Sequence, residues 1–319
     1  MNRDNAITAA NSAADGIDPM RWSFGRAREA FDLRRVNLTP LKLDFSGHSR
    51  EYCERVTGVD LTGVAVEDFH RHIPVEMQTP NEANINACTH LIQEAEDAAL
   101  YRDYIRVLLH ISYEILGSDL VFEAKPFLRL HFPQRMPSHF RLANGEMACY
   151  HNDMMFGEHA EQLNCWLSIT RCRGSSGLQV ASLVESCRIV DRFVDSLGLA
   201  QPDFAESRAR FFEWIRDDED MHRFVKERVS PMESEANELV MFDPIKIHGT
   251  AENIEDTTRS SIDFRIMPLD DYERIIRRAT ENAEKITSFD GMFYVRGDYY
   301  HSATIREYAM AHGLDGGVR

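Results

Sequence analysis

Short runs with the pattern of β-strands fill the sequence between residues 126 and 268, and this series constrains the fold more than any other feature. Residues 127–133 and 161–170 alternate apolar and polar side chains, which places successive side chains on opposite faces of a strand. Gly, Pro and Asn separate these runs from further strand-like runs at 237–244, 246–253 and 259–268. Many short strands punctuated in this way are typical of a sandwich or a jelly roll. The sequence therefore predicts a mainly β fold with flanking helices, built on an antiparallel double-stranded β-helix of the jelly-roll, cupin-like type.

Helical patterns stand before, inside and after this strand region. The second half of residues 81–117 has apolar residues at helical spacing, with Gly117 as the predicted end of the helix. Residues 203–229 and 270–286 have helical patterns too, and the latter is expected to be the last helix. We expect a mobile tail at 1–20 and a single domain at 21–319. That domain would comprise a helical N-terminal part at 21–125, a jelly-roll core at 126–268 with a helical insertion at 183–236, and a C-terminal helix and tail at 269–319.

The composition argues against several classes of function. The formal net charge is -16, whereas binding to nucleic acid or to anionic membranes needs a surplus of Lys and Arg. No stretch approaches the roughly 20 apolar residues that span a bilayer, and the first residues lack the apolar core of a signal peptide. The six cysteines form no CxxC pair, which favours reduced thiols. We therefore expect a cytoplasmic protein.

Two candidate metal ligands lie in CYHNDMMFGEH, residues 149–159, at the end of an extended run. His151 and Asp153 are two residues apart, so on a strand their side chains would point to the same side. A third ligand must come from elsewhere, and His248, at the end of another strand-like run, is the best candidate. Two His and one carboxylate on one face of an ion leave positions open, as in non-haem Fe(II) oxygenases. Cys149 is better explained as a buried free thiol than as a ligand.

A candidate anchor for a carboxylate follows the third ligand along the chain. Arg259 comes eleven residues after His248, and Ser261 lies two residues further on. On a neighbouring strand, the guanidinium could form two parallel bonds to a carboxylate inside the barrel. The hydroxyl of Ser261 would point to the same side and could add a further bond. The sequence thus predicts a metal triad together with a site for an acidic cosubstrate.

The combination of His151-x-Asp153, His248 and Arg259-x-Ser261 resembles the signature of the Fe(II)/2-oxoglutarate-dependent dioxygenases. The resemblance covers about residues 125–300, and its branch is that of the streptomycin-biosynthesis-type and phytanoyl-CoA-dioxygenase-like hydroxylases. It implies that the triad is catalytic and binds Fe(II), and that Arg259 and Ser261 hold the distal carboxylate of 2-oxoglutarate. It also implies that O2 is consumed while succinate and CO2 are released. Related halogenases lack the carboxylate of Asp153, so hydroxylation is expected, although desaturation and ring closure use the same site.

Further residues near these motifs are candidates for binding. Arg129 and His131 share a strand face and could contact cosubstrate or substrate, with a salt bridge or a hydrogen-bonded core pair as the alternative. Asn164 and Trp166 lie on the strand after the motif, where relatives often place residues that line the 2-oxoglutarate pocket, although a Trp at such a position is more often simply core. Arg265 would assist a carboxylate or be structural, and His159 would lie in a loop near substrate or solvent. We assign Arg129, Asn164 and Trp166 to the cosubstrate, and His131, Arg265 and His159 to the substrate.

These assignments predict an oxidoreductase of biosynthesis that hydroxylates an unactivated C–H bond of a small molecule. The substrate would be a sugar, an aminocyclitol, an amino acid or another specialised metabolite. Two other classes remain open: a cupin-like divalent-metal hydrolase or isomerase, which needs no Arg259 anchor, and a non-catalytic metal-binding barrel. The sequence also leaves the oligomeric state open, with a homodimer as one option.

Overall fold

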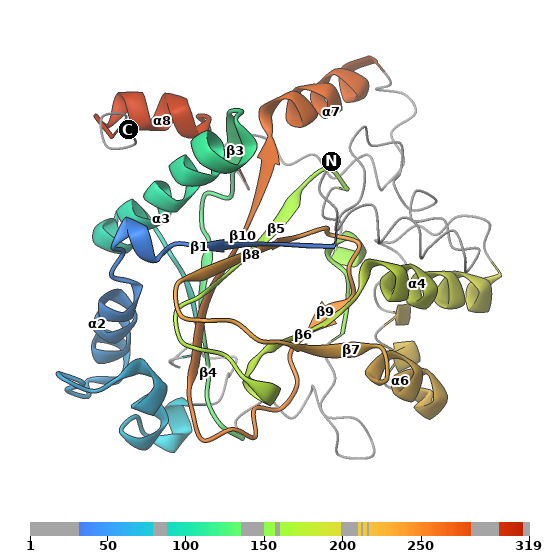
Figure 1. Cartoon of the computed structure of the whole chain (residues 1–319), viewed down its shortest axis with the longest axis horizontal. Coiled ribbons are helices and arrows are strands. Elements are labelled where there is room, and N and C mark those ends of the chain that lie inside the picture. Colours follow the sequence, from blue (N-terminus) through green and yellow to red (C-terminus); the bar gives the residue numbers. More distant parts are fainter. Residues whose placement is uncertain are drawn as a thin grey trace.

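The computed structural model contains two antiparallel β-sheets with helices packed around them (Figure 1). The predicted mobile tail, most of the extended run at 142–151, and His159 lie outside the residues that the structure describes. Among the described residues, no helix is long and apolar enough to cross a membrane. The structure describes residues 32–78, 88–134, 150–156, 160–198, 210–211, 213–215, 217–281 and 300–314.

The large sheet has seven strands in the order β1-β8-β5-β10-β4-β2, with β3 paired to one end of β10. Every pairing in it is antiparallel. The long strand β10 is central, because β4 and β3 pair with successive parts of one of its edges and β5 pairs with the other. The strands are β1 (Leu33–Asn37), β2 (Thr89–Leu91), β3 (Leu120–Phe122), β4 (Phe127–His131), β5 (Leu163–Ser168), β8 (Glu238–Phe242) and β10 (Arg259–Pro268).

The small sheet faces the inner side of the large one. It consists of β7 (Val229–Met232), β6 (Leu178–Ala181) and the two-residue strand β9 (His248–Gly249). Trp166 of β5 belongs to a buried cluster that also includes Val180 of the small sheet, so apolar side chains of both sheets meet between them. The other members of this inter-sheet cluster are Cys172, Leu178, Met232, Val240 and Phe242.

Helices cover the outer face of the large sheet, where the apolar side chains of its alternating strands are buried. Ile262 and Phe264 of β10 pack there in the main core, together with side chains of α2 (Phe45–Thr57), α3 (Ala98–His110) and α8 (Ile305–Ala311). Helix α3 continues as a π-helical turn and ends at Gly117, whose φ of 67° is the left-handed conformation that glycine adopts readily. Figure 1 shows these three helices on one side of the molecule.

A second core lies beside the small sheet. Helices α4 (Leu183–Leu197) and α6 (Glu219–Lys226) contribute to it, and so do Tyr150 and Met154, which flank the first two candidate ligands. Ile247, next to His248, is buried in the same cluster. This core therefore supports the chain on both sides of the candidate metal ligands.

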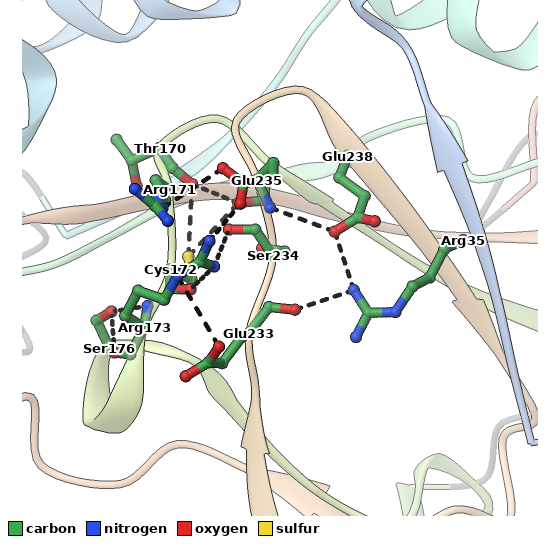
Figure 2. Close-up of polar contacts among 11 residues, drawn as sticks. Arg35, Thr170, Arg171, Cys172, Arg173, Ser176, Glu233, Ser234, Glu235 and Glu238 are labelled. Atoms are coloured by element: carbon green, nitrogen blue, oxygen red, sulfur yellow. Dashed lines mark hydrogen bonds and ion pairs between the residues drawn. The ribbon is translucent and has the colours of Figure 1, made fainter.

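A polar cluster ties the edge of the large sheet to the turn that precedes β8 (Figure 2). Cys172 and Ser234 form a backbone bridge, and the guanidinium of Arg173 donates to the Ser234 carbonyl at 3.1 Å. Arg35 of β1 donates to the Glu233 carbonyl and to Glu238, both at 2.9 Å. These contacts fix the entrance to β8, a strand that lines the inter-sheet space.

The prediction of a mainly β fold with flanking helices is confirmed, and the strand-like runs at 127–133, 161–170 and 259–268 contain β4, β5 and β10. The N-terminal part, predicted to be helical, differs, because it also contributes β1, β2 and β3 to the large sheet. These strands are three to five residues long, too short to show a period. The helix predicted to be last, α7 (Leu269–Glu281), is followed by α8.

Candidate metal centre

His151 and His248 come from segments that lie side by side. The backbone amide of His151 donates to the His248 carbonyl at 2.9 Å, and the amide of His248 donates back at 2.8 Å. Residues paired in this way project their side chains to the same face. Their ring centroids are accordingly only 4.5 Å apart.

Asp153 completes the group from a turn, not from a strand. It opens the 3-10 turn η7 (Asp153–Phe156), and its amide donates to the Pro244 carbonyl at 3.1 Å. Its Oδ1 lies 3.3 Å from Nε2 of His248 and 3.6 Å from Nε2 of His151. The potential ligand atoms of the three residues lie within 4.8 Å of one another, as the sequence predicted. The expectation of a continuous strand is corrected, since the turn brings the carboxylate to the imidazoles.

The imidazole of His248 is held in one tautomer. Its Nδ1 lies 2.9 Å from the Lys246 carbonyl oxygen, which can only accept a hydrogen bond, so Nδ1 donates. The lone pair of a neutral ring is then on Nε2, the nitrogen that faces Asp153. Fixing the outer nitrogen in this way is typical of metal-ligating histidines.

The two oxygens of Asp153 have different partners. Oδ2 accepts from Nε and Nη2 of Arg265 at 3.2 and 3.1 Å, whereas Oδ1 is buried without a hydrogen-bond donor among the described residues. Burial alone would raise the pKa of Asp153, but the charge of Arg265 and, after it, the interactions with the two neighbouring imidazoles outweigh burial and hold this pKa well below its usual range. A buried carboxylate oxygen without a donor, facing two imidazole nitrogens, fits a divalent transition metal such as Fe(II).

Arg259 and Ser261 lie on the inner face of β10, which is turned toward the small sheet. Trp166 of the inter-sheet cluster stands opposite Asp263 in the register, and Ser261 and Arg259 share that face by alternation. Arg259 is buried and donates one hydrogen bond, at 3.3 Å, to the Ser176 carbonyl. Its Nε and the Oγ of Ser261 have no hydrogen-bond partner in the described part of the chain.

Two further inward-facing polar side chains come from the neighbouring strands β4 and β5. His131 stands directly opposite Arg259 in the register and is buried, and neither ring nitrogen is hydrogen-bonded within the described residues. Burial and the charge of Arg259 lower the pKa of His131 well below its usual value, so its ring is neutral. The side-chain amide nitrogen of Asn164 also lacks an acceptor in this part of the structure. Such groups are costly to bury unless something binds them.

Other residues predicted to bind cosubstrate or substrate already have partners within the protein. Arg129 forms a two-point ion pair with Asp263 at 2.6 and 3.1 Å, and Trp166 packs in the inter-sheet cluster. Arg265, expected on the substrate side, contacts a candidate metal ligand instead. The sequence reasoning missed Glu123, whose Oε2 accepts from the Arg265 amide at 3.0 Å. No local pattern signals this contact, because the two residues are 142 positions apart and meet only through sheet pairing.

No protein-family model and no curated protein matches the chain. Among solved structures, EctD from S. alaskensis with bound Fe is 10% identical, with coverage of 79% of this chain and 77% of that one and a TM-score of 0.40. SnoK, a non-heme alpha ketoglutarate dependent carbocyclase from nogalamycin biosynthesis, is 14% identical over 77% and 85%, with a TM-score of 0.39. AviO1 from Streptomyces viridochromogenes is 14% identical over 79% and 96%, with a TM-score of 0.40.

Proposed function

We propose that the chain is an Fe(II)- and 2-oxoglutarate-dependent oxygenase that hydroxylates a small molecule. The observation that supports this most is the buried triad of His151, Asp153 and His248, with its ligand atoms within 4.8 Å. Two imidazoles and one carboxylate form the facial set of ligands typical of non-haem Fe(II) oxygenases. Two facing antiparallel sheets are consistent with the predicted double-stranded β-helix.

The bound iron would supply the redox chemistry, in which O2 and 2-oxoglutarate yield succinate, CO2 and an oxidised C–H bond. The residues of the chain would bind the metal and the cosubstrate, orient the substrate, and exclude water. His151 and His248 would donate through Nε2 and Asp153 through Oδ1, the three atoms that face one another. The apolar inter-sheet cluster around Trp166 would keep water out of the pocket.

The inner face of β10 would bind the cosubstrate. The guanidinium of Arg259 can pair with a carboxylate, and the hydroxyl of Ser261 and the neutral ring of His131 can each donate a hydrogen bond. A dicarboxylate here would satisfy polar groups that are otherwise buried without partners. Arg129 would assist by neutralising Asp263, whose charge would repel the ligand.

Asn164 and Arg265 lie directly opposite each other in the register, near the metal centre. The amide of Asn164 would donate to the cosubstrate from the β5 side of the pocket. For the substrate we retain the predicted classes: a sugar, an aminocyclitol, an amino acid or another specialised metabolite. The presence of Asp153 at the third ligand position supports hydroxylation over halogenation.

Succinate release tests this proposal. Purified protein should convert 2-oxoglutarate to succinate only when Fe(II) and O2 are both present, and a metabolite panel should reveal the substrate by faster release. Arg259→Ala should retain Mn(II) binding but lose most 2-oxoglutarate binding, whereas His248→Ala should lose both. Arg274→Gln is a matched control, because that guanidinium pairs with Glu161 and Asp271, neither of which belongs to the triad. A protein that binds Mn(II) but releases no succinate, with metal binding unchanged by Arg259→Ala, would instead support a metal hydrolase or isomerase.

A further inference from the structure

The guanidinium of Arg265 is bonded to only one oxygen of the candidate ligand Asp153. Both Nε and Nη2 donate to Oδ2, at 3.2 and 3.1 Å. The other oxygen, Oδ1, is left to the two imidazoles, 3.3 Å from His248 and 3.6 Å from His151. The carboxylate is therefore divided between a cation of the protein and the position where a metal would bind.

Arg265 is itself fixed in place from several sides. Its amide donates to Oε2 of Glu123 at 3.0 Å, and its carbonyl accepts from the Glu123 amide at 3.0 Å. Its Nη1 lies 3.8 Å from Glu123 and 3.5 Å from Asp263, and both carboxylates are largely buried. A guanidinium flanked by two further carboxylates has little freedom to leave Asp153.

This arrangement determines how many coordination positions of a bound metal ion are taken by protein atoms. A carboxylate can bind a metal through one oxygen or through both. With Oδ2 held by Arg265, only Oδ1 can approach the ion, so the triad would supply three ligand atoms. If Oδ2 were released, Asp153 could bind through both oxygens and take a fourth position.

We propose that Arg265 is a positioning residue that restricts Asp153 to one metal bond and so keeps three positions of an octahedral ion open. The inference rests on the proposed function, because the open positions would serve the two donor atoms of the 2-oxo acid and O2. A purely structural ion pair would also stabilise the fold, but it would not set the number of open positions.

The number of water molecules on bound Mn²⁺ tests this, measured by water proton relaxation. The wild type should hold about three waters, and about one after 2-oxoglutarate is added. Without 2-oxoglutarate, the inner-sphere relaxation of Arg265→Gln should be about one third lower than that of the wild type, because about two waters would remain. With 2-oxoglutarate, Arg265→Gln should lose nearly all of the relaxation that the wild type retains. Arg265→Lys, which keeps the charge but lacks the paired donors, should lie between the wild type and Arg265→Gln under each condition.

The controls separate this inference from the proposed function. Arg274→Gln removes a guanidinium from the buried Glu161 without touching the triad, so its water count should equal that of the wild type. If the wild type fails to bind Mn²⁺ at all, the proposed function fails. If it binds Mn²⁺ and 2-oxoglutarate but a folded Arg265→Gln or Arg265→Lys protein keeps the wild-type count, only the role of Arg265 is wrong.

Discussion

At the scale of single residues, the centre depends on buried polar groups whose partners come from distant parts of the sequence. The backbone amide of Asp153 is bonded to the Pro244 carbonyl and its carboxylate to Arg265, and both partners are about a hundred residues away. The imidazole of His248 is bonded to the carbonyl of Lys246, only two residues before it. The fold therefore supplies the orientation of the carboxylate, whereas the local chain supplies that of the imidazole.

The buried thiols give a prediction at this scale. Burial raises the pKa of both Cys53 and Cys88 to about 12, so at pH 8 almost all of each thiol is protonated and unreactive. We expect iodoacetamide to leave both residues unmodified in the native protein and to label them in urea, with peptide mass spectrometry as the measurement. Labelling of the native protein at the rate seen in urea would show that these thiols are accessible.

The triad itself could be predicted from the sequence, and the arrangement around it could not. The His-x-Asp spacing alone is weak evidence, and His151, Asp153 and His248 are selected because Arg259 follows the distal His at a fitting distance within strand-like runs. The structure brings the ligand atoms of the three residues within 4.8 Å of one another. The contact of Arg265 with Asp153 depends on the position of a 3-10 turn relative to β10, which alternation along one strand does not reveal. Which groups lack partners also emerges only when three strands are paired.

At the scale of elements, β10 has two functions on its two faces. Its outward residues Ile262, Phe264 and Ile266 are buried in the main core, and its inward residues form the proposed pocket. The alternation of residues 259–268 made this strand predictable in full. The three N-terminal strands are short, and β1 is largely exposed, so no apolar period marks them.

Phe264→Ala tests how strongly β10 is packed. This side chain is fully buried against Tyr104 of α3, with ring centroids 5.1 Å apart. We expect the substitution to lower the free energy of unfolding by about 3–5 kcal/mol in urea denaturation. Val75→Ala, at a residue that is 54% exposed, should change it by less than about 0.5 kcal/mol. Equal effects of the two substitutions would contradict the assigned core.

At the scale of the whole molecule, the main core and the second core are separate, and the second one supports the candidate centre. The main core joins the N-terminal helices to the large sheet, and the second core joins α4 and α6 to the small sheet. The candidate ligands lie beside the second core, in which Met154 and Ile247 are buried, and the ring of His248 lies against Phe242 of the inter-sheet cluster. Polar contacts, such as those of the Asp97 carboxylate with Arg55 and His90, hold the segments of the N-terminal part together.

The carboxylate of Asp97 makes the stability of this part depend on pH. Burial raises its pKa, but bonds from the Gln93 amide, Arg55 and His90 outweigh burial and lower it. A lowered pKa stabilises the fold above the unfolded value near 3.8, and this contribution is lost as pH falls through the folded value. Asp97→Asn should therefore cost about 1–3 kcal/mol at pH 7 and progressively less below about pH 4, measured by denaturation at each pH. A cost that is independent of pH would contradict this.

The most direct test of the central claim is a crystal structure of the protein with Mn²⁺ and 2-oxoglutarate, with the metal located by its anomalous scattering. We predict that the anomalous peak marks an Mn²⁺ ion bonded to His151, His248 and one oxygen of Asp153. The distal carboxylate of 2-oxoglutarate should lie against Arg259. A metal bound away from this triad, or a 2-oxoglutarate that does not touch Arg259, would contradict the proposed oxygenase.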